Sequence, residues 1–271
     1  MPSYVITGVS KSLGFEFLRQ LSQDPTNLVI GIVRDKASTD NRVDVELSGR
    51  PNIHILQADI TDFNALQKAA IDTAKITGGS LDYLVANAGY VSHWDAYDPI
   101  GVLGEKPQEL EEDLMKCLKI NVVGNIHLFN LFMPLILKGN AKKVVALSSG
   151  HADLDSINAF DNEVAALYSI SKAAINVAVA KFSAQYKKQG VLFISISPGM
   201  VEVGHFKDAT PEQMQSLGGM LQKFQQYNPE FSGPMSPDAS VRAVISVWEK
   251  ASVQNGDGGS FVSHHGNKTW T

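Results

Sequence analysis

The chain has 271 residues, of which 44% are hydrophobic and 19% charged, as in ordinary globular proteins. Its formal net charge of −5 gives no basic footprint, which argues against nucleic acid and anionic membranes as partners. No stretch approaches the roughly 18 consecutive apolar residues of a membrane span. The apolar start runs directly into a glycine turn, so we expect no signal peptide. The single cysteine, Cys117, excludes an intramolecular disulfide and favours a cytoplasmic location.

Short runs rich in β-branched residues alternate with longer amphipathic stretches along the chain. The runs lie at residues 4–7, 28–33, 53–56, 81–87, 143–149, 191–197 and 259–263. Helical patterns lie at residues 12–23, 62–77, 107–137, 164–189 and 236–253. The runs are too continuously apolar for a sheet with one face in water, so we interpret them as buried parallel strands. The alternation predicts an α/β fold with a doubly wound, seven-stranded parallel sheet and helices on both faces.

The first turn, TGVSKSLG at residues 7–14, follows the first predicted strand and opens the first predicted helix. Backbone N–H groups at such a turn, together with the positive end of the helix, suit a pyrophosphate. Its glycines are Gly8 and Gly14, and Ser12 stands where a further glycine is usual. A tight turn that binds no ligand is the alternative interpretation.

Two basic residues lie near this turn. Lys11 is inside it, and Arg34 directly follows the second predicted strand. A site specific for NAD usually has an acidic residue at the end of that strand, where it binds the ribose 2′-hydroxyl. Here Asp35 comes only one position later. A guanidinium and an ammonium suit a 2′-phosphate instead, which indicates NADP (NADPH). Two solvated surface cations are the alternative.

The segment YSISK places Tyr168 and Lys172 one turn apart on the same face of a predicted helix. A free phenol has a pKa of about 10, and a nearby ammonium favours its ionised form. Such a tyrosine is a usable general acid or base. The pattern alone is common by chance and usually marks a surface pair, so it needs companions to be specific.

Those companions stand at the ends of three predicted strands and, for INVVG, within the long predicted helix. KVVALSS ends in Ser149, VANAG follows the fourth strand, INVVG contains Asn121, and SPGMV follows the sixth strand. With them, the chain resembles the short-chain dehydrogenases/reductases over essentially its whole length. Within that family it is similar to the single-domain carbonyl reductases that include the sniffer proteins. The resemblance implies one Rossmann-fold domain over residues 1–271 that carries out NADP-dependent oxidoreductase chemistry.

The resemblance also implies roles for individual residues. Tyr168 would protonate a carbonyl oxygen, Lys172 would lower the tyrosine pKa and bind the nicotinamide ribose, and Ser149 would orient the carbonyl. Asn121 would support a water that leads to Lys172. The implied cofactor-binding residues are Thr7, Gly8, Ser10, Lys11, Ser12, Leu13, Gly14, Arg34, Asp59, Ile60, Asn87, Ala88, Gly89, Tyr168, Lys172, Pro198, Gly199 and Val201.

The chain departs from the family pattern at three places. Ser12 replaces a glycine of the phosphate turn. Val203 stands where members often have a threonine that binds the nicotinamide carboxamide, so this contact would rest on backbone groups. The stretch from Ser149 to Tyr168 is several residues longer than usual, and we expect the insertion to line the mouth of the substrate site.

Residues on the predicted ligand side of the sheet are candidates for substrate contacts: His93, Trp94, His151, Met200 and His205. Residues 200–235 contain several methionines and aromatic residues, which predicts a substrate loop or lid. A helix that packs its own apolar face is the alternative. His264 and His265 have no Cys, Asp or Glu partners at ligand spacing, so we predict no metal site.

These observations predict an NADPH-dependent carbonyl reductase that converts a ketone or aldehyde of a small organic molecule to an alcohol, with a tyrosine as general acid. A pathway-specific alcohol oxidation, isomerisation or cyclisation is the second hypothesis. A non-catalytic NADP(H)-binding regulator is the third, motivated by Ser12 and Val203. The expected partner is a small-molecule carbonyl compound, without nucleic acid or membrane. Homo-oligomers, either dimers or tetramers, are common in the family, and the sequence does not choose among them.

Overall fold

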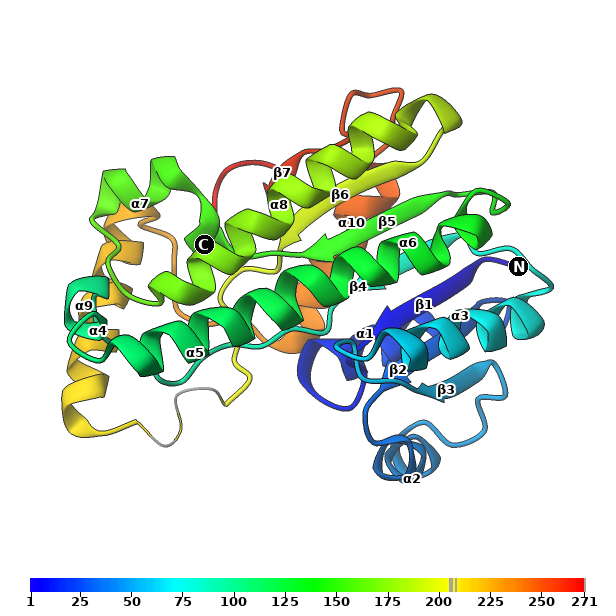
Figure 1. The fold of residues 1–271 in the computed structure, drawn as a ribbon, viewed down its shortest axis with the longest axis horizontal. Coiled ribbons are helices and arrows are strands. Elements are labelled where there is room, and N and C mark those ends of the chain that lie inside the picture. Colours follow the sequence, from blue (N-terminus) through cyan, green and yellow to red (C-terminus); the bar gives the residue numbers. More distant parts are fainter. Residues whose placement is uncertain (205–206, 208, 271) are drawn as a thin grey trace.

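The computed structural model describes residues 1–204, 207 and 209–270. Its strands form a seven-stranded sheet in the order β3-β2-β1-β4-β5-β6-β7, and all strand pairs are parallel (Figure 1). The strands are β1 (Ser3–Thr7), β2 (Leu28–Val33), β3 (Ile53–Gln57), β4 (Tyr83–Ala86), β5 (Lys143–Leu147), β6 (Leu192–Ser197) and β7 (Phe261–Ser263). The predicted doubly wound α/β fold is confirmed.

The predicted helices are also present, together with further helices. The helices are α1 (Ser12–Leu21), α2 (Lys36–Glu46), α3 (Phe63–Thr77), α4 (Ile100–Leu103), α5 (Pro107–Leu118), α6 (Gly124–Ile136), α7 (Leu154–Phe160), α8 (Ala166–Tyr186), α9 (Pro211–Tyr227) and α10 (Pro237–Lys250). The further ones are α2 and α9, which are 11 and 17 residues long, and the shorter α4 and α7. The helical pattern predicted over 107–137 is continuous, but a π-helical turn, Lys119–Val123, separates α5 from α6. None of the described helices is both long and apolar enough to cross a membrane.

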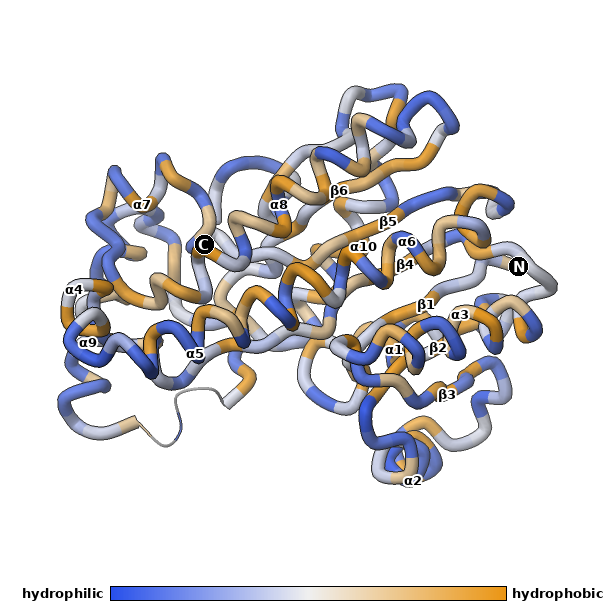
Figure 2. Tube along the Cα trace, viewed as in Figure 1, coloured by the Kyte–Doolittle hydropathy of each residue, from blue (hydrophilic) through white to orange (hydrophobic). Residues whose placement is uncertain are grey.

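The hydrophobic core forms two layers, one on each face of the sheet. On one face, α3, α6 and α8 contribute buried side chains such as Leu66, Phe129 and Val179. On the other face, α1 and α10 meet, and the Phe17 and Trp248 rings stack with their centroids 5.4 Å apart. Figure 2 shows hydrophobic colour along the strands and mixed colours along the helices. The continuous apolar runs are therefore strands that are covered on both faces.

The carboxyl ends of the strands all point toward one end of the molecule, where α4, α7 and α9 gather (Figure 1). Strand order reverses between β1 and β4, because β2 and β3 lie on one side of β1 while β4 to β7 lie on the other. In an open parallel sheet, ligands bind in the crevice beyond such a reversal. The turn after β1, the loop after β4 and the segments after β5 and β6 all lie beside it.

Candidate active site

The turn after β1 has the backbone shape that a phosphate site needs. Gly8 has φ +76° and Ser12 has φ +51°, so both adopt the left-handed conformation. Gly14 lies so close to the turn that a Cβ built on it would come within 2.0 Å of the Gly8 carbonyl oxygen. The backbone can therefore approach a ligand closely here. Ser12 keeps the glycine-like conformation at a cost of about 1 kcal/mol or more for a residue with a Cβ.

Thr7 and Asn87 join the ends of β1 and β4. The Thr7 hydroxyl oxygen accepts hydrogen bonds from the backbone N–H groups of Asn87 and Ala88, at 3.1 and 2.9 Å. The Asn87 side-chain amide donates to the Thr7 carbonyl oxygen at 2.9 Å. Both side chains thus fix the backbone of the crevice, which leaves direct contact between Asn87 and a ribose as a prediction.

Lys11 and Arg34 are both exposed at the rim of this turn. Within the described residues, neither side chain makes a hydrogen bond or an ion pair. Nearby, burial opposes ionisation of Asp59, but hydrogen bonds from Thr61 and the charge of Arg34 hold its pKa below the usual value. An open glycine turn with two uncommitted cations at its edge fits a dinucleotide that carries an additional phosphate.

Arg42 is a further basic residue at the turn that sequence reasoning missed. From α2 its guanidinium donates to the Ser10 carbonyl oxygen at 3.0 Å, and it lies 3.8 Å from the centroid of the Phe15 ring. This contact supports the outer side of the turn. Only the folded position of α2 brings the two residues together, so no local sequence signal predicts the contact.

The π-helical turn brings Asn121 into the interior beside the loop that follows β4. Its side-chain amide donates to the Tyr90 carbonyl oxygen and to the Ser171 hydroxyl, both at 2.9 Å. Its Oδ1 atom accepts from the Tyr90 N–H at 2.7 Å. A Cβ built on Gly89 would come within 3.2 Å of this Oδ1 atom and 3.5 Å of the Lys172 Nζ atom. Asn121 and Lys172 therefore both lie close against Gly89, where a side chain would crowd them.

Tyr168 and Lys172 lie near the start of α8, and both are enclosed. The Lys172 Nζ atom donates to the Leu147 carbonyl oxygen at 2.8 Å and lies 5.6 Å from the centroid of the Tyr168 ring. Burial lowers the pKa of Lys172 to about 8. Burial also raises the pKa of Tyr168 to about 12, against the effect of its hydrogen bond with Ser149. The phenol is therefore neutral at pH 7, and the amine is largely protonated.

Asp95 anchors the start of α8, a role that sequence reasoning missed. Its fully buried Oδ2 atom accepts hydrogen bonds from the backbone N–H groups of Leu167 and Tyr168, at 2.8 and 2.9 Å. Burial raises the pKa of Asp95, while these two bonds oppose the rise. The carboxyl group thus holds the loop after β4 against the helix that carries Tyr168.

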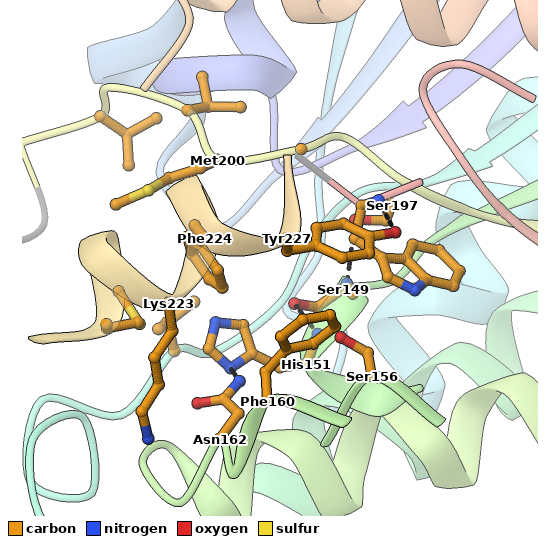
Figure 3. Close-up of a pocket in the computed structure, with 17 residues that line it drawn as sticks. Ser149, His151, Ser156, Phe160, Asn162, Ser197, Met200, Lys223, Phe224 and Tyr227 are labelled. Atoms are coloured by element: carbon orange, nitrogen blue, oxygen red, sulfur yellow. Dashed lines mark hydrogen bonds between the residues drawn. The ribbon is translucent and has the colours of Figure 1, made fainter. Parts of the chain in front are cut away.

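A cavity of about 210 Å³ lies above Ser149. Its lining residues come from the Ser149–Tyr168 insertion, the segment after β6, α9 and the carboxyl-terminal segment, with Val91 from the loop after β4 (Figure 3). Of the predicted substrate residues, His151 and Met200 line it, whereas His93 and Trp94, in the same loop as Val91, do not. His205 lies outside the described residues. Val203, in the place of a family threonine, also faces the cavity.

Four aromatic side chains form a wall of the cavity: Phe160, Phe224, Tyr227 and Trp270. The first three belong to the two segments predicted to line the substrate site, whereas sequence reasoning missed Trp270. The Trp270 ring stacks on Phe261 with their centroids 4.4 Å apart, and Trp270 packs so closely that a Cβ on Gly150 would meet it at 2.7 Å. The composition of residues 200–235 signals the α9 part of this wall, but nothing local signals Trp270.

The backbone after β6 offers unpaired groups to the crevice. Glu202 N–H donates to the Met235 carbonyl oxygen, and Met235 N–H donates to the Met200 carbonyl oxygen, both at 2.9 Å. Val201 lies between these bonds, and within the described residues its own N–H and C=O make none. Because Val203 has no hydroxyl group, the nicotinamide carboxamide would bind to backbone groups alone. The unpaired groups of Val201 fit that role.

Two further features of the site concern possible metal or thiol chemistry. The described residues contain no group of three or more His, Cys, Asp and Glu side chains that could hold a metal ion. Cys117 lies on α5 with no exposed surface, and burial raises the pKa of its thiol to about 12. It behaves as a small hydrophobic residue close enough to Tyr168 and Lys172 to influence their pKa values.

Comparisons with known proteins agree with this geometry. Residues 3–214 match the family model for short chain dehydrogenases. Over its full length and theirs, the chain is 68% identical to the short chain dehydrogenase virK of Hypocrea virens and 57% identical to the short-chain dehydrogenase/reductase iacC of Pestalotiopsis fici.

Solved structures show the same fold. An NADPH-bound carbonyl reductase from chicken fatty liver has 20% sequence identity and a TM-score of 0.77. The carbonyl reductase Sniffer of D. melanogaster has 23% identity and a TM-score of 0.75. In both comparisons 98% of each chain is covered. The predicted family resemblance is confirmed, and the chain belongs to the short-chain dehydrogenase family.

Proposed function

We propose that the protein is an NADPH-dependent carbonyl reductase that converts a ketone or aldehyde of a small organic molecule to an alcohol. Its family consists of oxidoreductases that use NAD(P) and act on small molecules. The observation that carries the proposal is the meeting of Ser149, Tyr168 and Lys172 beyond the end of β5. This group lies beside an apolar cavity, and Lys172 also lies close to Gly89 at the end of β4.

Three parts of the chain would hold the cofactor. The turn from Gly8 to Gly14 would bind the pyrophosphate, Lys11 and Arg34 the 2′-phosphate, and the Val201 backbone the carboxamide. When bound, NADPH supplies the hydride. Within the described residues neither cation makes a hydrogen bond or an ion pair, which leaves both available to a 2′-phosphate and supports NADPH rather than NADH.

The chain's own residues supply orientation and the proton. The Ser149 hydroxyl would donate a hydrogen bond to the substrate carbonyl oxygen. As hydride adds to the carbonyl carbon, Tyr168 would transfer its phenolic proton to that oxygen, so that C=O becomes CH–OH. The positive charge of Lys172 would stabilise the phenolate left on Tyr168.

The pKa of Tyr168 suits its role as a proton donor. A phenol with a pKa of about 12 remains protonated at pH 7, and this is the form that can donate a proton to a carbonyl oxygen. Alcohol oxidation needs the phenolate, so we expect oxidation to become faster at high pH and reduction to be supported at neutral pH.

The test is NADPH oxidation, followed by absorbance, against a panel of aldehydes, ketones and diketones. We expect Tyr168→Phe to lower kcat by about 10²- to 10⁴-fold and to leave the Kd for NADPH nearly unchanged. Tyr186→Phe, at the far end of the same helix, is the matched control and should keep normal activity. Full activity of Tyr168→Phe would refute the mechanism. Tight NADPH binding without turnover of any carbonyl would favour the regulator hypothesis.

We also propose that residues 1–271 act as one domain, with residues 200–235 as the substrate loop. The lining of the cavity by Met220 and Phe224 on α9 supports this role for the segment. We propose a cytoplasmic location, which the single cysteine favours. Exposed Met115 on α5 and Val177 on α8 support a homo-oligomer formed through these helices, which sedimentation analysis would test.

A further inference from the structure

The cavity above Ser149 combines aromatic walls with few polar groups. The Phe160 and Tyr227 rings meet edge to face with their centroids 4.8 Å apart, and Phe224 lies across from them (Figure 3). The Tyr227 hydroxyl donates to the Lys268 carbonyl oxygen at 2.7 Å and accepts from the Trp270 N–H at 3.2 Å. Tyr227 therefore presents its ring, not a free hydroxyl, to a ligand. Such walls favour a flat aromatic molecule.

Several of the polar groups around the cavity already have partners. The Lys223 ammonium donates to the Asp161 carbonyl oxygen at 2.6 Å. The Ser197 hydroxyl oxygen accepts from the Gly150 N–H at 3.0 Å. In contrast, the Nε2 atom of His151 has no hydrogen-bond partner among the described residues, although its ring lines the cavity between Phe224 and Asn162 (Figure 3).

Asn162 determines which form of the His151 ring faces the cavity. The Asn162 side-chain nitrogen lies 3.1 Å from the Nδ1 atom of His151. An amide N–H donates, so Nδ1 acts as the acceptor and the ring proton resides on Nε2. Burial lowers the pKa of His151 to about 4, so the ring is uncharged at pH 7. The cavity wall thus presents a neutral N–H donor.

This donor stands close to the proposed reaction centre along the chain. Ser149 and His151 are two residues apart at one helical turn, and the Ser149 hydroxyl oxygen accepts from the His151 backbone N–H at 3.3 Å. A substrate whose carbonyl lies on Ser149 therefore has the His151 ring beside it. An apolar group placed there would cover the Nε2–H group and leave it without a partner, which is unfavourable.

We propose that His151 Nε2–H binds a second oxygen of the substrate, which is an aromatic carbonyl compound with a hydroxyl, alkoxy or additional carbonyl oxygen near the reacting group. Asn162 is the positioning residue that keeps the donor proton on Nε2. The identity of the reacting carbonyl rests on the proposed reductase function. Recognition of the second oxygen does not, since it can be measured by binding alone.

The experiment compares acetophenone with its three monomethoxy isomers, whose added oxygen accepts but does not donate a hydrogen bond. Calorimetry with the NADP⁺-saturated protein gives dissociation constants without turnover, and NADPH oxidation gives kcat/KM separately. We expect at least one isomer to bind the native protein about tenfold more tightly than acetophenone, in line with one added hydrogen bond. His151→Phe should abolish this preference and change acetophenone binding less than about threefold.

Three further variants separate a hydrogen bond from a change of shape. His151→Gln retains an N–H donor and should keep part of the preference. Asn162→Leu should weaken the preference, while Asn158→Leu, on the exposed side of α7, should leave it unchanged.

The inference is overturned if no isomer is preferred by the native protein, or if none of the ligands binds. It is also overturned if His151→Phe retains the preference or weakens all the ligands equally. A preference that depends on His151, in a protein that reduces none of them, would uphold the inference and count against the reductase function.

Discussion

The two sides of the crevice are built in different ways. On the nucleotide side, backbone geometry at Gly8 and Gly14 shapes the site, and α1 buries Phe15, Phe17 and Leu18 against the sheet. On the substrate side, α7 buries no residue and α9 buries only Leu217. The proposed cofactor site is therefore formed mainly by the backbone of the fold, whereas the proposed substrate site is formed by side chains of added segments.

The same substitution on the two sides should have opposite effects. In Gly14→Ala the new Cβ would lie 2.0 Å from the Gly8 carbonyl oxygen and 2.6 Å from the Asn87 side-chain nitrogen. We expect a loss of about 3 kcal/mol or more in unfolding free energy and no NADPH binding. Gly218→Ala in α9 meets no atom within 4 Å and should gain up to about 1 kcal/mol. Urea denaturation and cofactor titration measure both. Equal effects would contradict the comparison.

Charge removal should also separate the two sides. Lys11→Ala and Arg34→Ala should each lower the preference for NADPH over NADH by about 10- to 100-fold, as expected for the loss of a charged hydrogen bond. Lys223→Ala, at the rim of the substrate cavity, is the control. It should change KM for the carbonyl substrate and leave the cofactor preference intact. The measurement is kcat/KM for each cofactor, and an unchanged preference in both nucleotide-side variants would argue against the 2′-phosphate site.

Acid should lower the unfolding free energy through His264, which packs against Gly199 just after β6. Burial, and to a lesser degree the charge of His265, lowers the pKa of His264 from 6.5 to about 4. Below pH 6.5 this histidine is therefore protonated in the unfolded chain, whereas in the folded chain it stays neutral down to about pH 4. The stability present at neutral pH is lost as the pH falls through this window, by about 2 kcal/mol at pH 5.

Urea denaturation at a series of pH values checks this expectation. His264→Phe should reduce the pH dependence between pH 7 and pH 5, and the part that remains should come from His151, whose pKa burial also lowers to about 4. His127→Phe, a control on the sheet's other helical layer, should keep it. An unchanged slope in His264→Phe would assign the acid sensitivity to other groups.

Ser12→Gly should produce the smallest change. The substitution removes a Cβ from a residue with φ +51°, which stabilises the folded chain by about 1 kcal/mol. We expect the Kd for NADPH to shift by less than about fivefold, because most of that gain is present with and without cofactor. Ser10→Gly, in the same turn but without a positive φ, is the control and should bring no such gain. A native protein that binds no NADPH, restored by Ser12→Gly, would show that serine disables the turn.

The nucleotide side could be predicted from sequence because its signals are local. Strand periodicity, the glycines of the first turn and the YSISK spacing each lie within a few adjacent residues. The π-helical turn at Asn121 could not be predicted, since the pattern over 107–137 is continuous. The contacts of Asp95 and Trp270 join residues that are far apart in the chain. Asp95 and Leu167, for example, are hydrogen-bonded across 72 positions. For the same reason, the sequence could not place His93 and Trp94 relative to the cavity.

Cys117 can report on the packing of α5 against α8, the helix that carries Tyr168 and Lys172. It is the single thiol of the chain, it has no exposed surface, and it lies on α5, which packs against α8. A thiol reagent can reach it only when these two helices separate. The alkylation rate therefore measures the local opening equilibrium of α5 and α8 next to Tyr168 and Lys172. Ligands that stabilise the closed form should slow the labelling in proportion to their occupancy. The labelling rate of a residue outside the proposed chemistry would thereby measure the local stability around the two residues proposed to carry it out.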